Sequence, residues 1–208
     1  MYQKELLKTM NRNVYIDENV ILEEGAIILQ NSIVLGESKI SKGAIIGPNS
    51  VIINSVIGPN TYVLSSWVVD TVVGASCTIG PYANLRKENF LFDNIRIGNF
   101  VEVKNAIIKT NSKASHLSYI GDSVIGNNCN FGCGSITVNY DGKTKHQTTI
   151  GDNVFVGCNS NLVAPIKIDD NSFIACGSTI TKNVPKNSLS IARSYQINKD
   201  GYLIKQKE

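Results

Sequence analysis

The sequence is short of aromatic residues, of long apolar runs and of basic clusters, and each shortage excludes a class of protein. Aromatic residues fill only 7% of the 208 positions although 42% are hydrophobic. This composition favours a core of layered, Ile- and Val-rich strands over a helical globule. No apolar run approaches the ~18 residues that span a bilayer. The net charge is +3 and no Lys/Arg run is interleaved with aromatic residues, so we expect neither a membrane nor nucleic acid as a partner.

Cysteine usage and the first residues bear on location and on metals. Residues 1–5 are polar and lack the apolar core of a signal peptide. Five cysteines are an odd number in a chain without such a signal, which predicts reduced thiols and a cytoplasmic protein. Cys129 and Cys133 form a CxxxC spacing, but no second pair completes a zinc site. We therefore expect no metal.

The sequence does have a period of six. Aliphatic residues recur every six positions from Ile16 to Ile52, and again from Ile150 to Ile180. A helix needs a period near 3.6 and a half-buried strand a period of 2, so neither explains the spacing. Six is the signature of the hexapeptide β-helix, in which each hexad is one short strand and a turn.

The hexads also share a form, as in Ile46-Gly-Pro-Asn-Ser50 and Ile150-Gly-Asp-Asn-Val154. The aliphatic residue points into a narrow prism, and Gly, Pro and Asn tolerate the dihedrals of its corners. Three hexads, about eighteen residues, would close one triangular coil, and each coil buries its neighbour. The sequence thus predicts an all-β parallel β-helix.

Three regions follow from this pattern. Residues 1–13 form a short N-terminal arm with helical apolar spacing, and residues 14–184 form the β-helix. The repeat fades after Lys182, so residues 185–208 are predicted to be a C-terminal tail that caps the open end of the prism.

Two stretches depart from the repeat. In Arg86–Asn94, the run Phe90-Leu91-Phe92 is unlike any hexad and predicts an interruption. Phe131 and Val156 are twenty-five residues apart, one coil of eighteen plus seven, so a loop of seven residues near Asn139–Lys145 must leave the coil. Breaks in a monotonous scaffold are where function usually lies.

The same loop brings three cysteines into phase. Cys158 and Cys176 are eighteen residues apart, and Cys133 precedes Cys158 by eighteen plus seven. The three should stack in one column along an edge of the prism. They are either small corner-filling residues, or the edge of a groove for a thin, extended ligand such as pantetheine.

Six segments are more specific than the generic hexad. They are Gly80–Arg86, Gly98–Lys104, Lys113–Asp122, Ile136–Gly142, Val154–Gly157 and Leu162–Pro165. Through them the chain, from about Val14 to Arg193, resembles the C-terminal acetyltransferase half of the bifunctional N-acetylglucosamine-1-phosphate uridyltransferase/glucosamine-1-phosphate acetyltransferase. The resemblance implies a left-handed β-helix, a homotrimer and active sites at subunit interfaces.

By this resemblance His116 is the general base of acetyl transfer from acetyl-CoA to glucosamine-1-phosphate. The amino sugar carries an ammonium group, which must lose a proton before nitrogen attacks the thioester. An imidazole that titrates near ~6.5 suits that task at cellular pH. The family transfers the acetyl group directly, so no acetyl-enzyme and no metal are expected.

The resemblance also implies the binding residues. Arg86 and Lys104 match the cations that hold the sugar phosphate. Tyr119 and Asn130 match groups that contact the sugar, and Lys145 matches a loop lysine that reaches the neighbouring subunit's site. The matches to acetyl-CoA contacts are Asn139, Tyr140, Cys158, Cys176 and Arg193. The backbone N–H of Cys133 matches the donor that faces the acetyl oxygen and would stabilise the oxyanion.

The sequence departs from the family in two respects. Nothing in residues 1–15 resembles the family's nucleotide-binding half, so we expect neither uridyltransferase activity nor a need for magnesium. Cys133, Cys158 and Cys176 stand where Ala or Ser is common, and a thiol near a thioester could be acylated or oxidised.

Three other functions fit parts of the pattern. A related enzyme could acylate another amino sugar or sugar nucleotide through the same histidine. A metal enzyme of the γ-carbonic anhydrase type would need about three His ligands, whereas the chain has only His116 and His146. A non-catalytic, trimeric β-helix subunit needs only the generic repeat.

Overall fold

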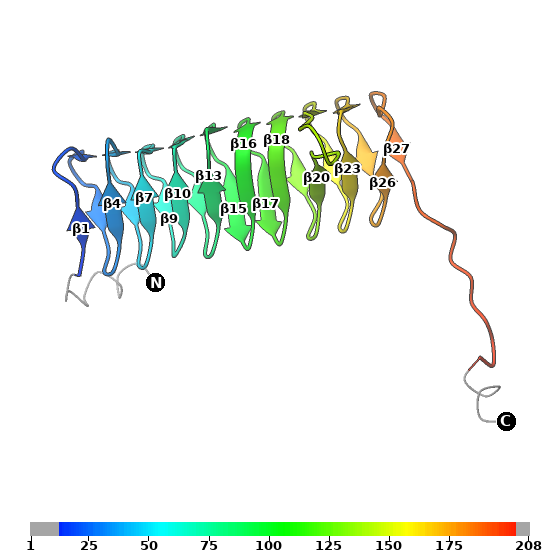
Figure 1. Ribbon diagram of the computed structural model, residues 1–208, viewed down its shortest axis with the longest axis horizontal. Coiled ribbons are helices and arrows are strands. Elements are labelled where there is room, and N and C mark those ends of the chain that lie inside the picture. The colour runs from blue at the N-terminus through cyan, green and yellow to red at the C-terminus, as the bar shows by residue number, and fades with distance from the viewer. Residues whose placement is uncertain (1–12, 203–208) are drawn as a thin grey trace.

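The computed structural model describes residues 13–202, and every regular element in that range is a β-strand. The strands are short, parallel to their neighbours and stacked coil on coil into a rod that runs from β1 to β27 (Figure 1). Each coil contributes one strand to each of three faces. The predicted all-β parallel β-helix is therefore confirmed, and its coils match the left-handed β-helix of hexapeptide repeats.

Two of the faces join through β16 and β18, which turn the corner between them without ending. The first face contains β1 (Tyr15–Ile16), β4 (Ile33–Leu35), β7 (Val51–Ile53), β10 (Trp67–Val69), β13 (Asn84–Arg86), β16 (Glu102–Ile108), β18 (Tyr119–Ile125), β20 (Ile136–Val138), β23 (Asn161–Val163) and β26 (Thr179–Ile180). The second face contains β2 (Ile21–Leu22), β5 (Lys39–Ile40), β8 (Val56–Ile57), β11 (Thr71–Val73), β14 (Asn89–Leu91), the later residues of β16 and β18, β21 (Thr148–Ile150) and β24 (Ile166–Ile168). We call these face 1 and face 2.

Face 3 is a separate ten-stranded sheet. It contains β3 (Ile27–Ile28), β6 (Ile45–Ile46), β9 (Tyr62–Val63), β12 (Thr78–Ile79), β15 (Arg96–Asn99), β17 (Lys113–His116), β19 (Asn130–Phe131), β22 (Phe155–Val156), β25 (Phe173–Ile174) and β27 (Leu189–Ser190). The coil runs through faces 1, 2 and 3 in that order.

The core is a column of aliphatic side chains, one from each strand of a coil. Ile40, Ile46 and Ile52 supply one coil's set, and all three are completely buried. Burial of such side chains stabilises the fold by ~25 cal/mol per Å² of apolar surface, so the period of six fixes which residues point inward. Because neighbouring coils cover each other's backbone, a run of two-residue strands is enough to build the rod.

Asparagine forms the corner between faces 2 and 3. Five asparagines from successive coils have positive φ there and link their side-chain amides at 3.0–3.2 Å. They are Asn111, Asn128, Asn153, Asn171 and Asn187. Asn tolerates the left-handed region better than most residues, and the amide ladder pairs polar groups at the corner. The predicted role of Asn in the turns is confirmed.

The seven-residue loop is also confirmed. Phe131 pairs with Val156 across neighbouring coils of face 3, so the coils are back in phase after the loop. The extra residues lie between β20 and β21, where Tyr140 and Lys145 form an isolated antiparallel bridge. The loop therefore leaves the rod at the corner between faces 1 and 2.

The expected interruption over Arg86–Asn94 is wrong. β13 and β14 pair in register with the coils on either side, and Leu91 is completely buried. The six-residue interval from Leu85 to Leu91 is intact. Phe90 and Phe92 point outward and pack edge to face, with ring centroids 5.0 Å apart. The stretch is therefore a regular hexad in which two exposed aromatic residues, Phe90 and Phe92, flank the buried Leu91.

The ends of the chain complete the description. The expected helical arm lies almost entirely outside the described residues. At the other end, β27 lies within the stretch predicted as a tail and pairs with β25, so it adds a strand to face 3. Ala192 still hydrogen bonds to Ser178 and Thr179, and the chain beyond it runs away from the rod (Figure 1). Within residues 13–202, no helix is long and apolar enough to cross a membrane.

Candidate active site

His116 stands at the end of β17, at the corner between faces 3 and 1. The chain turns there through Leu117, which has a φ of +45°. Ser118 stabilises the turn because its hydroxyl donates to the His116 carbonyl at 2.9 Å and to the Gly132 carbonyl at 3.3 Å. The turn leaves the imidazole exposed on the outside of the corner.

The imidazole is oriented by Asn99, one coil earlier. The two residues are in register on β15 and β17, and His116 Nδ1 lies 2.7 Å from Asn99 Oδ1. An amide oxygen only accepts hydrogen bonds, so with this amide orientation Nδ1 carries the hydrogen. Nε2 is then left with the lone pair that a base needs. Asn99 was not among the residues singled out from sequence, although it lies one coil before His116 in the chain.

The three cysteines form the predicted column. Phe131, Val156 and Ile174 are in register on face 3, and each cysteine follows two residues after one of them. The backbone confirms the stacking, since Asn159 N donates to Cys133 O and Gly177 N donates to Cys158 O, both at 2.8 Å. Cys158 and Cys176 are exposed, Cys133 is half-buried, and all three are free thiols.

His116 and Arg193 lie at the two ends of this column. Ala114 is in register with Phe131, so His116 lies one coil before Cys133. At the far end, the side chain of Arg193 passes over Gly177, where an added Cβ would be 3.7 Å from Arg193 Cδ. The structure thus arranges these two residues and the three cysteines along one edge of the rod.

A second cluster, around Lys104, lies at the corner between faces 1 and 2. The side chain of Lys104 is buried, and its ammonium donates to Asp122 Oδ2 at 3.2 Å. Asn105 donates to Asp122 Oδ1 at 2.6 Å, and Asn139 donates to Asp122 Oδ2. Asn139 also donates to the Tyr119 hydroxyl at 3.3 Å. Predicted substrate residues thus meet around an acidic residue that sequence reasoning did not single out.

The charges of this cluster influence one another. The neighbouring ammonium of Lys104 lowers the pKa of Lys145, because two positive charges close together repel each other. Contact with the Lys145 amine, followed by the carboxylate of Asp122, raises the pKa of Lys104 despite its burial. Burial works to raise the pKa of Asp122, but hydrogen bonds from Asn105, Lys104 and Asn139 outweigh it and lower that pKa.

The extruded loop that carries Lys145 is held by its own hydrogen bonds. Asp141 accepts from the backbone N–H groups of Lys143 and Thr144, both at 2.7 Å, and pairs with His146 Nε2 at 2.7 Å. The hydrogen bond from His146 and those from the backbone hold the pKa of Asp141 well below its usual range. The N–H of His146 donates to Asn139 O at 2.8 Å, which closes the base of the loop.

The remaining predicted residues, Arg86, Asn130 and Tyr140, make no hydrogen bond to either cluster among the described residues. Arg86 is in register with Lys104 on face 1, and its guanidinium Nε donates to Glu102 at 2.7 Å. Asn130 lies on face 3, in register with Lys113. Tyr140 is 56% exposed on the extruded loop.

The side chain of Asn139 is buried and hydrogen bonds within the Lys104 cluster. The contact with acetyl-CoA that the resemblance implies for Asn139 stays a prediction. The structure does not bring Asn139 to the cysteine column. The sequence offered a signal, because Lys104 and Asp122 are eighteen residues apart, about one coil. In the structure Lys104 is in register with Gly121, so the side chains of Lys104 and Asp122 meet diagonally across the corner.

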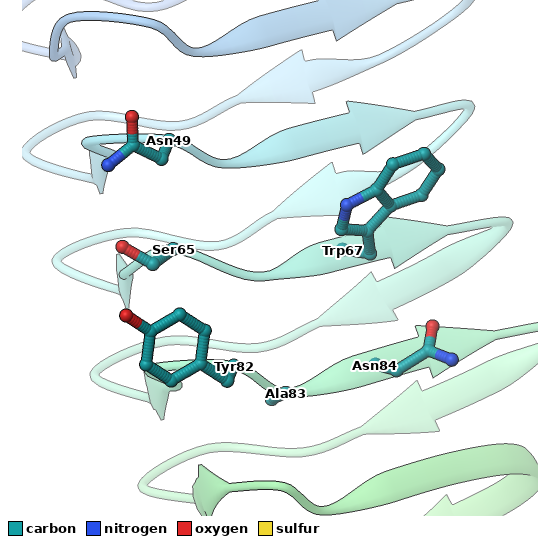
Figure 2. A pocket seen from close by; sticks show the side chains of 6 residues that line it. All are labelled: Asn49, Ser65, Trp67, Tyr82, Ala83 and Asn84. Atoms are coloured by element: carbon teal, nitrogen blue, oxygen red, sulfur yellow. The ribbon is translucent and has the colours of Figure 1, made fainter.

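A pocket lies at the beginning of face 1, over β10 and β13 (Figure 2). Trp67 and Tyr82 come from neighbouring coils and both are more than half exposed. Tyr82 also stacks on Phe100, with ring centroids 5.6 Å apart. The full lining is Asn49, Ser65, Trp67, Tyr82, Ala83 and Asn84. No predicted site residue lines this pocket.

Comparison with known families agrees with the repeat. Residues 47–133 match the family described as GlmU-like, C-terminal hexapeptide. Residues 147–182 match the family described as bacterial transferase hexapeptide (six repeats). The fold and these matches define a hexapeptide-repeat β-helix protein.

Comparison with individual curated proteins shows similarity to bifunctional protein GlmU. The chain is 60% identical over 137 residues to bifunctional protein GlmU of Acholeplasma laidlawii, covering 66% of this chain and 30% of that protein. It is 51% identical over 142 residues to bifunctional protein GlmU of Clostridium botulinum, covering 68% of this chain and 31% of that protein. The resemblance to the C-terminal half of GlmU is confirmed. The chain spans about a third of the length of these relatives.

Solved structures support the fold. LpxA, a UDP-N-acetylglucosamine acyltransferase from Bacteroides fragilis, superposes with a TM-score of 0.56. The match covers 85% of this chain and 68% of LpxA at 18% sequence identity. At that identity, the comparison establishes a shared architecture.

Proposed function

We propose that the chain transfers an acetyl group from acetyl-CoA to the amine of glucosamine-1-phosphate, forming N-acetylglucosamine-1-phosphate and free CoA. The observation that carries the proposal is the His116–Asn99 pair. An exposed imidazole whose Nδ1 is hydrogen-bonded to an amide oxygen presents a basic Nε2 to solvent. The resemblance to GlmU supplies the acceptor, the donor and the homotrimer as parts of the same proposal.

The chemistry needs a base, an oxyanion donor and a leaving group. Nε2 of His116 takes a proton from the ammonium of the sugar, and the freed nitrogen attacks the thioester carbonyl. The backbone N–H of Cys133 is the proposed donor to the oxyanion. As the C–S bond breaks, the sulfur leaves as the thiolate of CoA and receives the proton from His116, while the new amide nitrogen loses its second proton to water. No acetyl-enzyme forms in this scheme.

Charge complementarity supports a phosphate-bearing acceptor. Lys104 and Lys145 meet at one corner of face 1, and Arg86 is in register with Lys104 on the same face. A phosphate oxygen is a strong acceptor for such cations. Asp122 and Glu102 offset two of the three positive charges of Arg86, Lys104 and Lys145, so the group keeps one positive charge for an anion.

The cysteine column supports an extended donor. Its residues present small side chains on successive coils, with His116 at one end and Arg193 at the other. In the proposed complex the pantetheine arm lies along the column, its thioester near His116 and its phosphates near Arg193.

Two separate corners support the proposed trimer. His116 lies where face 1 begins and the Lys104 cluster lies where it ends, with Tyr119–Gly121 between them. Three strand residues span roughly 10 Å. We propose that neighbouring copies pack so that corners of different subunits meet, which completes each site.

The proposal is tested by measuring free CoA released from acetyl-CoA with glucosamine-1-phosphate. We expect His116→Ala to lower kcat by roughly 10²–10⁴-fold, with the assembly unchanged by light scattering. Lys109→Ala, an exposed change on the same coil, is the matched control and should keep full activity. Full activity of His116→Ala would refute His116 as the base, and a wild-type chain that releases no CoA would favour a non-catalytic scaffold. Turnover of a UDP-linked amino sugar but not of glucosamine-1-phosphate would refute the acceptor.

A further inference from the structure

We propose that Asp122 is a positioning residue that holds the Lys104 ammonium and the base of the extruded loop in the arrangement the acceptor site requires. The inference rests on the proposed function for its substrate. Its geometric part, the attachment of the loop to Asp122, is independent of that function.

Both carboxylate oxygens of Asp122 are occupied by side chains from the coil before it and the coil after it. Oδ1 accepts from Asn105 at 2.6 Å and from Lys104 at 3.4 Å, while Oδ2 accepts from Lys104 at 3.2 Å and from Asn139. Lys104 and Asn105 belong to the preceding coil, and Asn139 to the following one. One carboxylate therefore fixes three coils at the corner where face 1 ends.

The backbone presents Asp122 at that corner. The residue has a φ of +47° in the middle of β18, where the strand bends from face 1 to face 2. Asn105 occupies the same place one coil earlier, with a φ of +49°. Because the corner directs these side chains toward each other, the contact is a consequence of the repeat as well as of charge.

Lys104 and Asp122 are both buried, so the loss of either charge should affect the other strongly. Lys104 is 5% exposed and Asp122 is 9% exposed. A charge this deep is costly when it is unpaired, so removing the carboxylate leaves the buried ammonium beside the Lys145 amine without its carboxylate partner. Lys104 would then move toward solvent or toward another anion.

The loop is attached through Asn139. Its side chain donates to Asp122, while its backbone carbonyl accepts from the His146 N–H at 2.8 Å. Lys145 immediately precedes His146, so the position of its ammonium depends on the Asp122–Asn139 contact. The Tyr119 hydroxyl, which accepts from Asn139 at 3.3 Å, belongs to the same set.

Asp122 does not act as the base in this proposal. Its oxygens are taken by Lys104, Asn105 and Asn139, so it has no open position for a substrate proton. It acts through Lys104 and Asn139, and its loss should weaken acceptor binding more than the chemical step.

The experiment compares Asp122→Asn with Asp170→Asn in the full chain. Asp170 is a matched control because it accepts the Asp152 N–H at 2.9 Å and pairs with Lys186 at a different corner. For Asp122→Asn we expect the KM for glucosamine-1-phosphate to rise about tenfold or more, as loss of a charge-assisted hydrogen bond predicts. The KM of Asp122→Asn for acetyl-CoA should change less than about twofold. Both KM values of Asp170→Asn should also change less than about twofold.

A double-mutant cycle separates positioning from general stability. Combined with Lys104→Met, the Asp122→Asn change should add little further to the acceptor KM, because both changes disable the same contact. Additive effects would overturn the proposal, as would an unchanged KM in the single variant.

Hydrogen exchange tests the loop without any turnover. In Asp122→Asn the amide hydrogen of His146 should exchange faster than in the wild type. The exchange rate of the Val156 amide, on face 3 of the coil after that of Asp122, should stay the same. Equal protection of His146 in both proteins would overturn the attachment of the loop. If the wild-type chain fails to acetylate glucosamine-1-phosphate, the proposed function fails, and this measurement still decides the role of Asp122 in holding the loop.

Discussion

Asn99 Oδ1 accepts a hydrogen bond from His116 Nδ1 at 2.7 Å, across two neighbouring coils of face 3. The repeat itself creates this contact, because residues that are one coil apart stack in register. A rigid β-helix therefore orients the proposed base without any loop or lid.

The first prediction concerns this pair. Asn99→Ala should lower kcat by roughly tenfold, because the imidazole loses the partner that fixes its tautomer and ring orientation. Asn99→Asp should restore orientation but move the acidic limb of the pH–rate profile to higher pH, since a carboxylate favours the charged imidazole. Identical pH profiles for wild type and Asn99→Asp would contradict the assigned contact.

A second prediction follows from the two lysines. The pKa of Lys145 is lowered by the Lys104 ammonium, so Lys145 should lose its charge at a lower pH than an ordinary lysine. Affinity for a phosphate-bearing acceptor should therefore decline as pH rises through that lowered pKa. Lys104→Met should return the Lys145 titration toward the usual lysine range, as ¹³C NMR of methylated lysines would record. An unchanged Lys145 titration in the variant would rule out the coupling.

Acid should weaken the same corner, which gives a third prediction. The pKa of Asp122 is depressed in the folded chain, so its ionised carboxylate contributes stability above the ordinary Asp value of ~3.9. That contribution is lost as pH falls through the depressed pKa. The difference in Tm between wild type and Asp122→Asn should therefore be larger at pH 7 than at pH 3. A constant difference would show that the charge contributes nothing.

The cysteine column gives a fourth prediction. Cys158 and Cys176 are exposed and should react readily with iodoacetamide, whereas the buried Cys77 and Cys129 should not. Burial also raises the pKa of the Cys77 and Cys129 thiols, which makes them less nucleophilic. Acetyl-CoA should protect Cys158 and Cys176 from alkylation, as mass spectrometry of the labelled chain would record. Equal labelling with and without acetyl-CoA would argue against a donor lying along the column.

The fifth prediction separates two adjacent residues of β14. Leu91→Ala should destabilise the fold by about 2–5 kcal/mol, because it empties a buried position of the core. Phe90→Ala, at a 44% exposed position, should cost much less. Thermal unfolding of the two variants provides the comparison. A larger loss for Phe90→Ala would contradict the regular hexad assigned to this stretch.

The sequence alone determined the scaffold. The spacing of aliphatic residues identified the inward column, the Asn-rich turns and the seven-residue loop, because a repeat places residues in space through a single count. It failed at Arg86–Asn94, where Phe90 and Phe92 obscured the six-residue interval. Aromatic residues look like core in a sequence, and only the alternation within β14 revealed that they face outward.

Tertiary structure decided how the polar residues meet. The column of Cys133, Cys158 and Cys176 followed from counting, whereas the Asp122 cluster depends on how the corner bends and on where Lys104 directs its ammonium. Asn139 shows the difference: its place in the chain indicated the loop, but its buried contact with Asp122 appeared only in the fold. The periodicity of the sequence fixes the backbone register. A long, flexible side chain can contact several residues in that register, and only the tertiary structure shows which of them it contacts.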